Sequence, residues 1–134
     1  MVALQRDMEQ TRQIEFSWTD ERRLAAELTF DEKWTWEDLF VAQAKVNQAA
    51  RQHGGPLDLV YNLSRTRMLP RQFFTQLKRV YGTIPAEVTL VIMVGCNPTI
   101  INLVRSVTRS DQEMAQRFAF VDTLEEAYYI IEPN

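Results

Sequence analysis

The segment VTLVIMV, residues 88–94, is apolar at six of its seven positions and rich in β-branched side chains. A run of this length and composition, lying between Pro85 and Gly95, is typical of a strand that is covered on both faces of a sheet. Strands of this kind occur in sheets that carry helices on both sides. The segment therefore predicts an α/β fold in which residues 88–94 form the central strand.

Two further segments have the same strand-like character. LDLVYNL, residues 57–63, precedes the polar loop SRTR, and FAFV, residues 118–121, is a shorter apolar run. Residues 70–82 and 99–109 lie between these segments, and their apolar side chains recur at the intervals of three and four that are typical of helices. Pro70 suits the first turn of a helix, because its missing N–H would have no partner there. Strands joined by helical crossovers lie parallel, with right-handed connections.

Polar residues and glycine mark the other expected helix ends. Thr35 and Asp38 are spaced as a capping box in which Asp replaces the usual Glu, and Gly54 ends the helix that they open. Thr123 and Glu126 form another capping box at the start of the last helix. The side chains that this last helix is expected to bury are Leu124, Ala127, Tyr128 and Ile131.

Two alternating segments near the amino terminus predict a β-hairpin. Residues 14–18 alternate between apolar and polar side chains, and residues 25–30 do so after the polar turn TDERR. One face of the hairpin is expected to be wetter, and in the second strand it consists of Ala25, Glu27 and Thr29. The order is β-β-α-β-α-β-α-β-α, and a short extra helix can form at residues 111–117, before the last strand. This order predicts a mixed sheet in one α/β sandwich domain, residues 13–134, after a tail of residues 1–12.

Composition limits the class of protein. The chain has 134 residues, 46% hydrophobic and 25% charged, which is ordinary for one globular domain. No apolar run approaches the roughly 20 residues of a membrane span, and the amino-terminal residues contain no apolar signal core. One Cys and one His cannot assemble a zinc site of the usual kind or an intramolecular disulfide. We therefore expect a cytoplasmic protein with no integral membrane segment, no metal and no cofactor.

The net charge is −3, but charge is unevenly distributed along the chain. Residues 41–110 carry nine basic and two acidic side chains, whereas residues 1–40 carry five and ten. The basic middle could attract an anion or an acidic protein surface, although its ordinary interpretation is a solvated helix face. Phe73, Phe74 and Tyr81 lie among these basic residues, but their helical spacing favours core packing over nucleic-acid stacking. No nucleic-acid partner is expected.

The element order, the strand-loop-helix of residues 57–74 and the ending FAFVDTLEEAYYII resemble STAS domains, the sulfate transporter and anti-sigma-factor antagonist modules that include the SpoIIAA-like group. The resemblance runs from Ile14 to Ile131. It implies a STAS-like α/β sandwich and a non-enzymatic regulatory module that binds another protein. In these domains a Leu-Glu-Glu-Ala-like helix start follows the last strand, and the matching residues here are Leu124, Glu125, Glu126 and Ala127.

The resemblance also implies where a phosphorylation switch would lie. The family carries an Asp-Ser-Ser-Gly-like turn after the third strand, whose Ser is offered to an anti-sigma-factor kinase. Counting from Asn62, this turn falls near residues 68–71, Met-Leu-Pro-Arg, which contain no hydroxyl. Ser64 and Thr66 are the nearest substitutes, but hydroxyls in such loops usually bond to their own backbone. The chain is therefore expected to lack the usual phosphorylatable serine.

Candidates for catalysis are few. His53 lies near a helix C-terminus, where a positive charge is favourable. Cys96 lies between a strand and a helix N-terminus, which can activate a thiol, although a lone Cys there is more often a small buried residue. GCNPTI lacks the lysine of a phosphate loop and the glycines of a dinucleotide site, and Asn62 stands where a receiver domain would need Asp. We expect no catalytic residue and no enzyme.

The leading hypothesis is a protein-binding surface formed by the loop after residues 57–63 and the outer face of the second helix. Its arginines would donate to carboxylates or phosphate, and Met68 and Leu69 would supply the apolar part. An acidic protein surface would fit, and an edge strand could also pair with a second copy to give a homodimer. The residues expected to bind the partner are Ser64, Arg65, Thr66, Arg67, Met68, Leu69 and Arg71.

The alternative is a binder of a small anionic or lipid-like ligand, since domains that resemble this one in topology hold lipids. The pocket would lie beside the helix N-termini at Pro70 and Pro98, with Cys96 and Asn97 as candidate contacts. A deep apolar cavity would favour the ligand, and a filled core would favour the interaction module.

Overall fold

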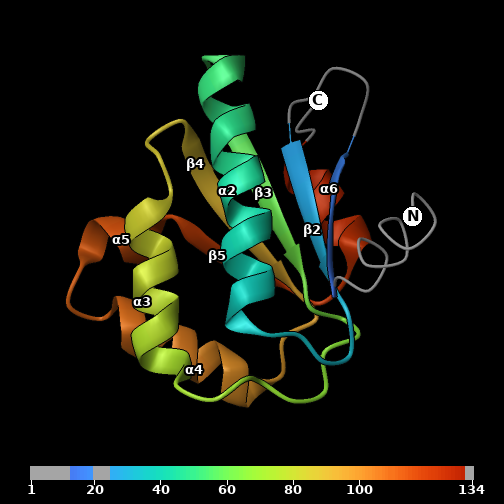
Figure 1. Cartoon of the computed structure of the whole chain (residues 1–134), viewed down its shortest axis with the longest axis vertical. Coiled ribbons are helices and arrows are strands. Elements are labelled where there is room, and N and C mark those ends of the chain that lie inside the picture. Colours follow the sequence, from blue (N-terminus) through green and yellow to red (C-terminus); the bar gives the residue numbers. More distant parts are fainter. Residues whose placement is uncertain (1–12, 20–24, 132–134) are drawn as a thin grey trace, which may run out of the picture.

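The computed structural model describes residues 13–19 and 25–131, which form five strands and five helices (Figure 1). Residues 1–12, most of the hairpin turn and residues 132–134 lie outside the described residues. No helix of the described part is long and apolar enough to cross a bilayer. The strands are β1 (Ile14–Trp18), β2 (Ala25–Phe30), β3 (Leu57–Asn62), β4 (Val88–Val94) and β5 (Phe118–Val121). The helices are α2 (Trp36–His53), α3 (Phe73–Thr83), α4 (Pro98–Thr108), α5 (Gln112–Gln116) and α6 (Leu124–Ile131).

The strands form one mixed sheet in the order β1-β2-β3-β4-β5. β1 and β2 are antiparallel, and every other neighbouring pair is parallel, which confirms the expectation from hairpin and crossovers. Residues 88–94 form β4, which lies between β3 and β5, whereas β3 occupies the centre. The prediction of the central strand is therefore wrong, because an apolar run reports burial on both faces and any interior strand is buried in this way.

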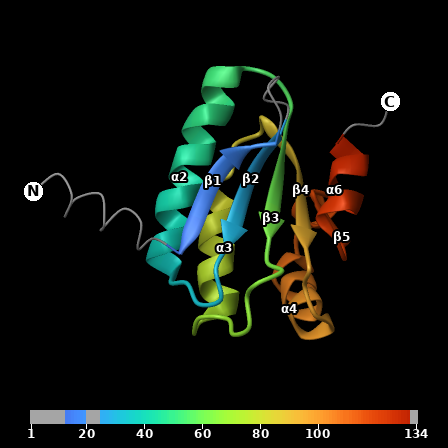
Figure 2. The same cartoon turned by 90° about the vertical axis from the view of Figure 1, so that its right-hand side faces the viewer.

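Helices cover both faces of the sheet, but unequally. Figure 2 shows α2 and α3 on one side of the strands and α6 on the other. The larger core joins α2, α3 and α4 to one face. Among the described elements, α6 is the helix that covers the opposite face, so the α/β sandwich is confirmed. The buried residues of the smaller core are Ala25, Val60, Ile92, Val94, Ala127 and Ile131.

The outer face of the hairpin is drier than predicted. Ala25 and Glu27 on β2 are buried, because α6 reaches over this face, and Glu15 on β1 is exposed. The Glu27 carboxylate accepts hydrogen bonds from the Thr29 hydroxyl at 3.1 Å and the Tyr128 hydroxyl at 2.8 Å. These bonds offset the cost of burying a polar group. The expected wetter face is therefore wrong for β2.

The last helix buries a narrower stripe than predicted. Ala127 and Ile131, one turn apart, are buried, and Leu124 is partly buried. Tyr128 was expected in the core but is 37% exposed, and Tyr129 is 83% exposed. A single helix on a sheet touches it along one line of side chains, so neither tyrosine ring reaches the core.

Most of the predicted helix ends are confirmed. The Thr35 hydroxyl accepts from the Asp38 N–H at 3.1 Å, and the Asp38 carboxylate accepts from the Thr35 N–H at 2.9 Å, which completes the capping box. Gly54 ends α2 with a left-handed backbone. The Thr123 hydroxyl accepts from the Glu126 N–H at 3.2 Å, and the extra short helix is present as α5.

Gly95 brings the end of β4 against the loop that follows β3. Its φ of +76° lies in the left-handed region that favours glycine. A Cβ at this position would lie 2.8 Å from the Cα of Ser64, closer than packed atoms tolerate. Glycine therefore allows the two loops at the carboxyl ends of β3 and β4 to touch.

We expect Gly95→Ala to lower the free energy of unfolding by more than Gly54→Ala does. Gly54 has nearly the same φ, +75°, but nothing lies within 4 Å of the site of its Cβ. Gly54→Ala therefore reports the left-handed backbone cost alone, about 1–2 kcal/mol, whereas Gly95→Ala adds the clash with Ser64. Urea titration followed by tryptophan fluorescence measures both losses. Equal losses would contradict the tight contact between the loops.

Candidate functional site

The loop of residues 64–71 leaves the carboxyl end of β3 beside the connection that follows β4. The Leu63 N–H donates to the Val94 carbonyl at 2.9 Å, which extends the strand pairing to the start of the loop. The Asn62 side-chain oxygen accepts from the Ser64 N–H at 3.1 Å and from the Ser64 hydroxyl at 2.7 Å. The Ser64 hydroxyl is thus paired locally, although with a side chain and not with the backbone.

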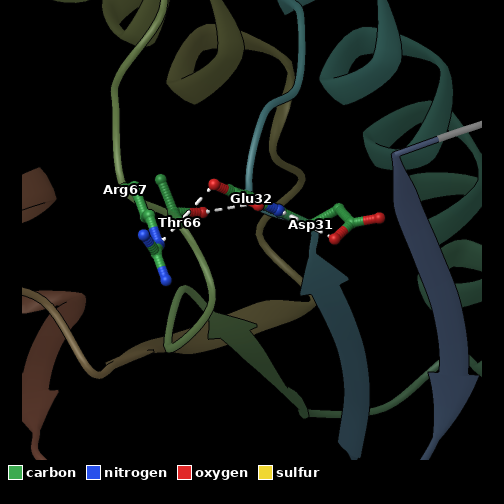
Figure 3. Close-up of polar contacts among 4 residues, drawn as sticks. All are labelled: Asp31, Glu32, Thr66 and Arg67. Carbon is green, nitrogen blue, oxygen red and sulfur yellow. Dashed lines mark hydrogen bonds and ion pairs between the residues drawn. The ribbon is translucent and has the colours of Figure 1, made fainter.

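Thr66 ties the loop to the segment that follows β2 (Figure 3). Its hydroxyl donates to the Asp31 carbonyl at 3.1 Å. The same hydroxyl accepts from the indole N–H of Trp34 at 3.2 Å. The Arg67 N–H donates to the Glu32 carbonyl at 3.3 Å, and the two side chains form an ion pair at 3.6 Å. Because Trp34 is buried, these contacts fix the loop backbone to the core.

Trp36 anchors the other end of the loop. Its indole N–H donates to the Arg71 carbonyl at 2.6 Å, and Gln72, the residue before the helix, has a left-handed φ of +62°. α3 therefore begins at Phe73, and the predicted start at Pro70 is wrong. The bond to Trp36, which is 35 residues away, competes with the local helix signal.

The side chains of the loop divide into outward and inward groups. Met68 is 63% exposed, the Arg67 side chain is 81% exposed, and Arg65 and Arg71 are also exposed. Leu69 is partly buried and packs against the larger core, so Met68 alone presents a large apolar side chain to solvent here. The structure thus brings three arginines and one methionine onto the same exposed loop.

The outer face of α3 continues this exposed loop. Phe74, which the sequence placed in the core, is 47% exposed, and the Lys78 ammonium lies 5.9 Å from the centre of its ring. Leu77 and Val80 face the core as predicted. Phe74 is therefore a functional candidate that sequence reasoning missed. Its i, i+4 spacing to the charged Lys78 was the available signal.

Cys96 and Asn97 lie on the connection between β4 and α4. The Asn97 side-chain oxygen accepts from the Ile100 N–H at 2.9 Å, so it caps α4. Burial raises the pKa of the Cys96 thiol to about 12, which opposes activation by the helix N-terminus. Cys96 packs against the larger core as a small, partly buried residue.

The open space near the start of α3 does not favour the ligand alternative. The space beside Leu69 and Phe73 measures about 10 Å³, which holds at most a water molecule. Pro70 does not begin a helix, so only Pro98 supplies a helix N-terminus. Among the described residues, no three His, Cys, Asp or Glu side chains gather as metal ligands.

The role of Trp34 and Trp36 in holding the loop was also missed from the sequence. Trp34 and Trp36 stand before α2, and their indole N–H groups need partners when the rings are packed. Two closely spaced tryptophans were a signal that this segment contacts something polar. The sequence could not identify their partners, Thr66 and Arg71, because these residues are more than 30 positions away along the chain.

Thr66→Val is expected to lower the free energy of unfolding by about 1–3 kcal/mol, because it leaves the buried indole N–H of Trp34 without its acceptor. Thr75→Val, at an exposed position of α3, is the matched control and should change little. Chemical denaturation compares the two, and hydrogen exchange at the Arg67 amide should rise only in Thr66→Val. The role of Thr66 would be refuted if both variants lost the same stability.

Cys96 is expected to react slowly with iodoacetamide. With its pKa raised to about 12, the thiolate fraction at pH 8 is at least about a hundredfold below that of an ordinary thiol. The alkylation rate should keep rising with pH beyond 9, and the chain in guanidinium chloride should react at the ordinary rate. Mass spectrometry of the alkylated protein gives both rates. A midpoint below pH 9 in the folded protein would contradict the buried thiol.

The chain is similar to known proteins in its fold. No family model and no curated protein matches the chain. Solved structures do match, and two of them each have 14% sequence identity. The Bacillus cell fate determinant SpoIIAA, in its phosphorylated form, matches with a TM-score of 0.60 over 89% of this chain and 99% of that chain. The protein TM1081, solved by NMR, matches with a TM-score of 0.59 over 89% of this chain and 88% of that chain. The chain therefore has the STAS-like α/β fold of SpoIIAA.

Proposed function

We propose that the chain is a non-enzymatic, cytoplasmic regulatory module that binds another protein. The binding site is a surface that we call the loop surface, formed by Arg65, Arg67, Met68 and Arg71 of the loop and by Phe74 of α3. Thr66 and Leu69, which are partly buried, support the loop from the core side, and the exposed Ser64 is held by its bonds to Asn62. The STAS-like fold of a cell fate determinant supports a regulatory role for this module.

The observation that carries this proposal is an exposed apolar side chain among arginines on a loop with a fixed backbone. Met68 is 63% exposed, and the loop is tied to Trp34 and Trp36 at two points. Met and Arg are enriched in protein interfaces. A loop that is already ordered loses less conformational entropy when it binds a partner.

The arginines indicate an acidic partner. Within residues 13–19 and 25–131, Arg65 and Arg71 form no ion pair, and Arg67 forms only the exposed one with Glu32. An exposed pair of this kind contributes about 0–1 kcal/mol, so a partner carboxylate can replace Glu32. Guanidinium groups bind carboxylates in a bidentate manner. The expected partner surface therefore has carboxylates around a site that accepts Met68.

We further propose that this surface works without phosphorylation. SpoIIAA was solved in a phosphorylated form, but residues 68–71 of this chain contain no hydroxyl. The Ser64 hydroxyl is bonded to Asn62, and the Thr66 hydroxyl is bonded to Trp34 and Asp31. Transfer of a phosphate to either residue would cost these bonds.

The double variant Arg65→Glu/Arg71→Glu is expected to abolish capture of the partner. Affinity purification from an extract of the host, read by mass spectrometry, identifies what the wild-type chain captures and whether the variant loses it. The melting temperature should not change, because both side chains are exposed and without ion pairs in the described part.

The matched control is Lys45→Glu/Arg51→Glu, which makes the same charge change at exposed positions of α2. This control and Ser64→Ala should both retain capture. The proposal fails if the loop variant still captures the partner, or if the α2 variant loses it equally.

A further inference from the structure

The strand β5 leaves one edge of the sheet open. It is the last strand in the order, and within residues 13–19 and 25–131 it pairs only with β4. The Val91 N–H donates to the Arg117 carbonyl at 2.7 Å, and the Gly95 N–H donates to the Val121 carbonyl at 3.0 Å. Because backbone groups alternate in direction along a strand, the N–H and C=O of Phe118 and Phe120 face away from β4. No residue of the described part bonds to them.

A groove of about 400 Å³ lies along this open edge. β5 forms one wall with Phe118 and Phe120, and α4 forms the other with Val104, Arg105 and Arg109. The volume of the groove is far larger than that of the spaces inside the core, which measure about 10 Å³ each. The groove therefore combines unpaired strand backbone, apolar walls and two cationic side chains.

The positive charge of the groove favours an acidic ligand. Arg105 and Arg109 have no carboxylate within ion-pair distance in the described part of the chain, and the Arg105 guanidinium lies 5.6 Å from the centre of the Phe120 ring. Arg105 and Arg109 are one helical turn apart, so their Cβ atoms are separated by about 5–6 Å. Residues i and i+2 of a strand are separated by about 6.6 Å and point to the same face. Acidic side chains at alternate positions of an extended segment can therefore pair with both arginines.

We propose that the edge of β5 and the adjoining groove form a second interaction site, at which an extended acidic segment of a partner protein adds to the sheet as a sixth strand. The backbone of Phe118 and Phe120 supplies the hydrogen bonds of strand addition, and the arginines select for acidic residues at alternate positions. A second copy of this chain fits less well, because two β5 edges related by a two-fold axis would bring the arginines of both copies together. This site is independent of the loop surface.

The test uses two fluorescent peptides of seven residues and the whole chain. One peptide alternates glutamate with valine, and the other alternates lysine with valine. Fluorescence anisotropy at low ionic strength is expected to show binding of the glutamate peptide and none of the lysine peptide. Arg105→Glu/Arg109→Glu should weaken binding by roughly tenfold or more, whereas Lys45→Glu/Arg51→Glu and the loop variant Arg65→Glu/Arg71→Glu should leave it unchanged.

Hydrogen exchange separates strand addition from simple charge attraction. Bound peptide should slow exchange at the amides of Phe118 and Phe120, because addition of a strand pairs these groups. Analytical ultracentrifugation of the wild-type and Arg105→Glu/Arg109→Glu chains gives the oligomeric state. The proposal is overturned if both peptides bind alike, if the two amides stay unprotected, or if binding maps to the loop surface. It is also overturned if a second copy of the chain occupies the edge of β5. The same holds if no peptide binds and the Arg105→Glu/Arg109→Glu chain forms oligomers, because the arginines would then serve only to prevent self-association.

Discussion

Burial of β3 and β4 on both faces is the constraint on which the rest of the structure depends. Val60, Ile92 and Val94 face α6, and their neighbours along the strands face the larger helical layer. Each fully buried side chain of this kind contributes about 1.5–3 kcal/mol, so neither face can be left open. Helices must therefore cross over between the strands, and the strands become parallel. The carboxyl ends of β3 and β4 then lie side by side at one end of the sheet, where Gly95 lets the two loops touch.

The loop surface follows from this arrangement and from the two tryptophans. Because the strands are parallel, the loop lies at the carboxyl end of the sheet. Trp34 and Trp36, in the segment before α2 and at its start, fix the backbone of the loop. The side chains of Arg65, Met68 and Arg71 need make no contact for the fold, so they are available to a partner. At the same end of the sheet, burial raises the pKa of the Cys96 thiol, which opposes its activation as a nucleophile.

Local patterns predicted most of the fold, and contacts between distant residues account for the errors. Caps such as Thr35 with Asp38 depend only on near neighbours, and they were found from the sequence. The start of α3 depends on the bond from Trp36 to Arg71, so Pro70 was misleading. Phe74 and Tyr128 were placed in the core because a periodic pattern gives the direction of a helix face but not its width. The loop was recognised as a candidate, but the contacts that hold it could not be.

The most direct test of the loop surface is site-specific photo-cross-linking in the native host. p-Benzoylphenylalanine is placed at Met68 on the loop or at Val41, an exposed apolar position of α2 that serves as the control. The account predicts that irradiation links a protein to position 68 and that this protein is absent from the sample with the probe at position 41. Equal cross-linking from both positions, or cross-linking from position 41 alone, would contradict the account.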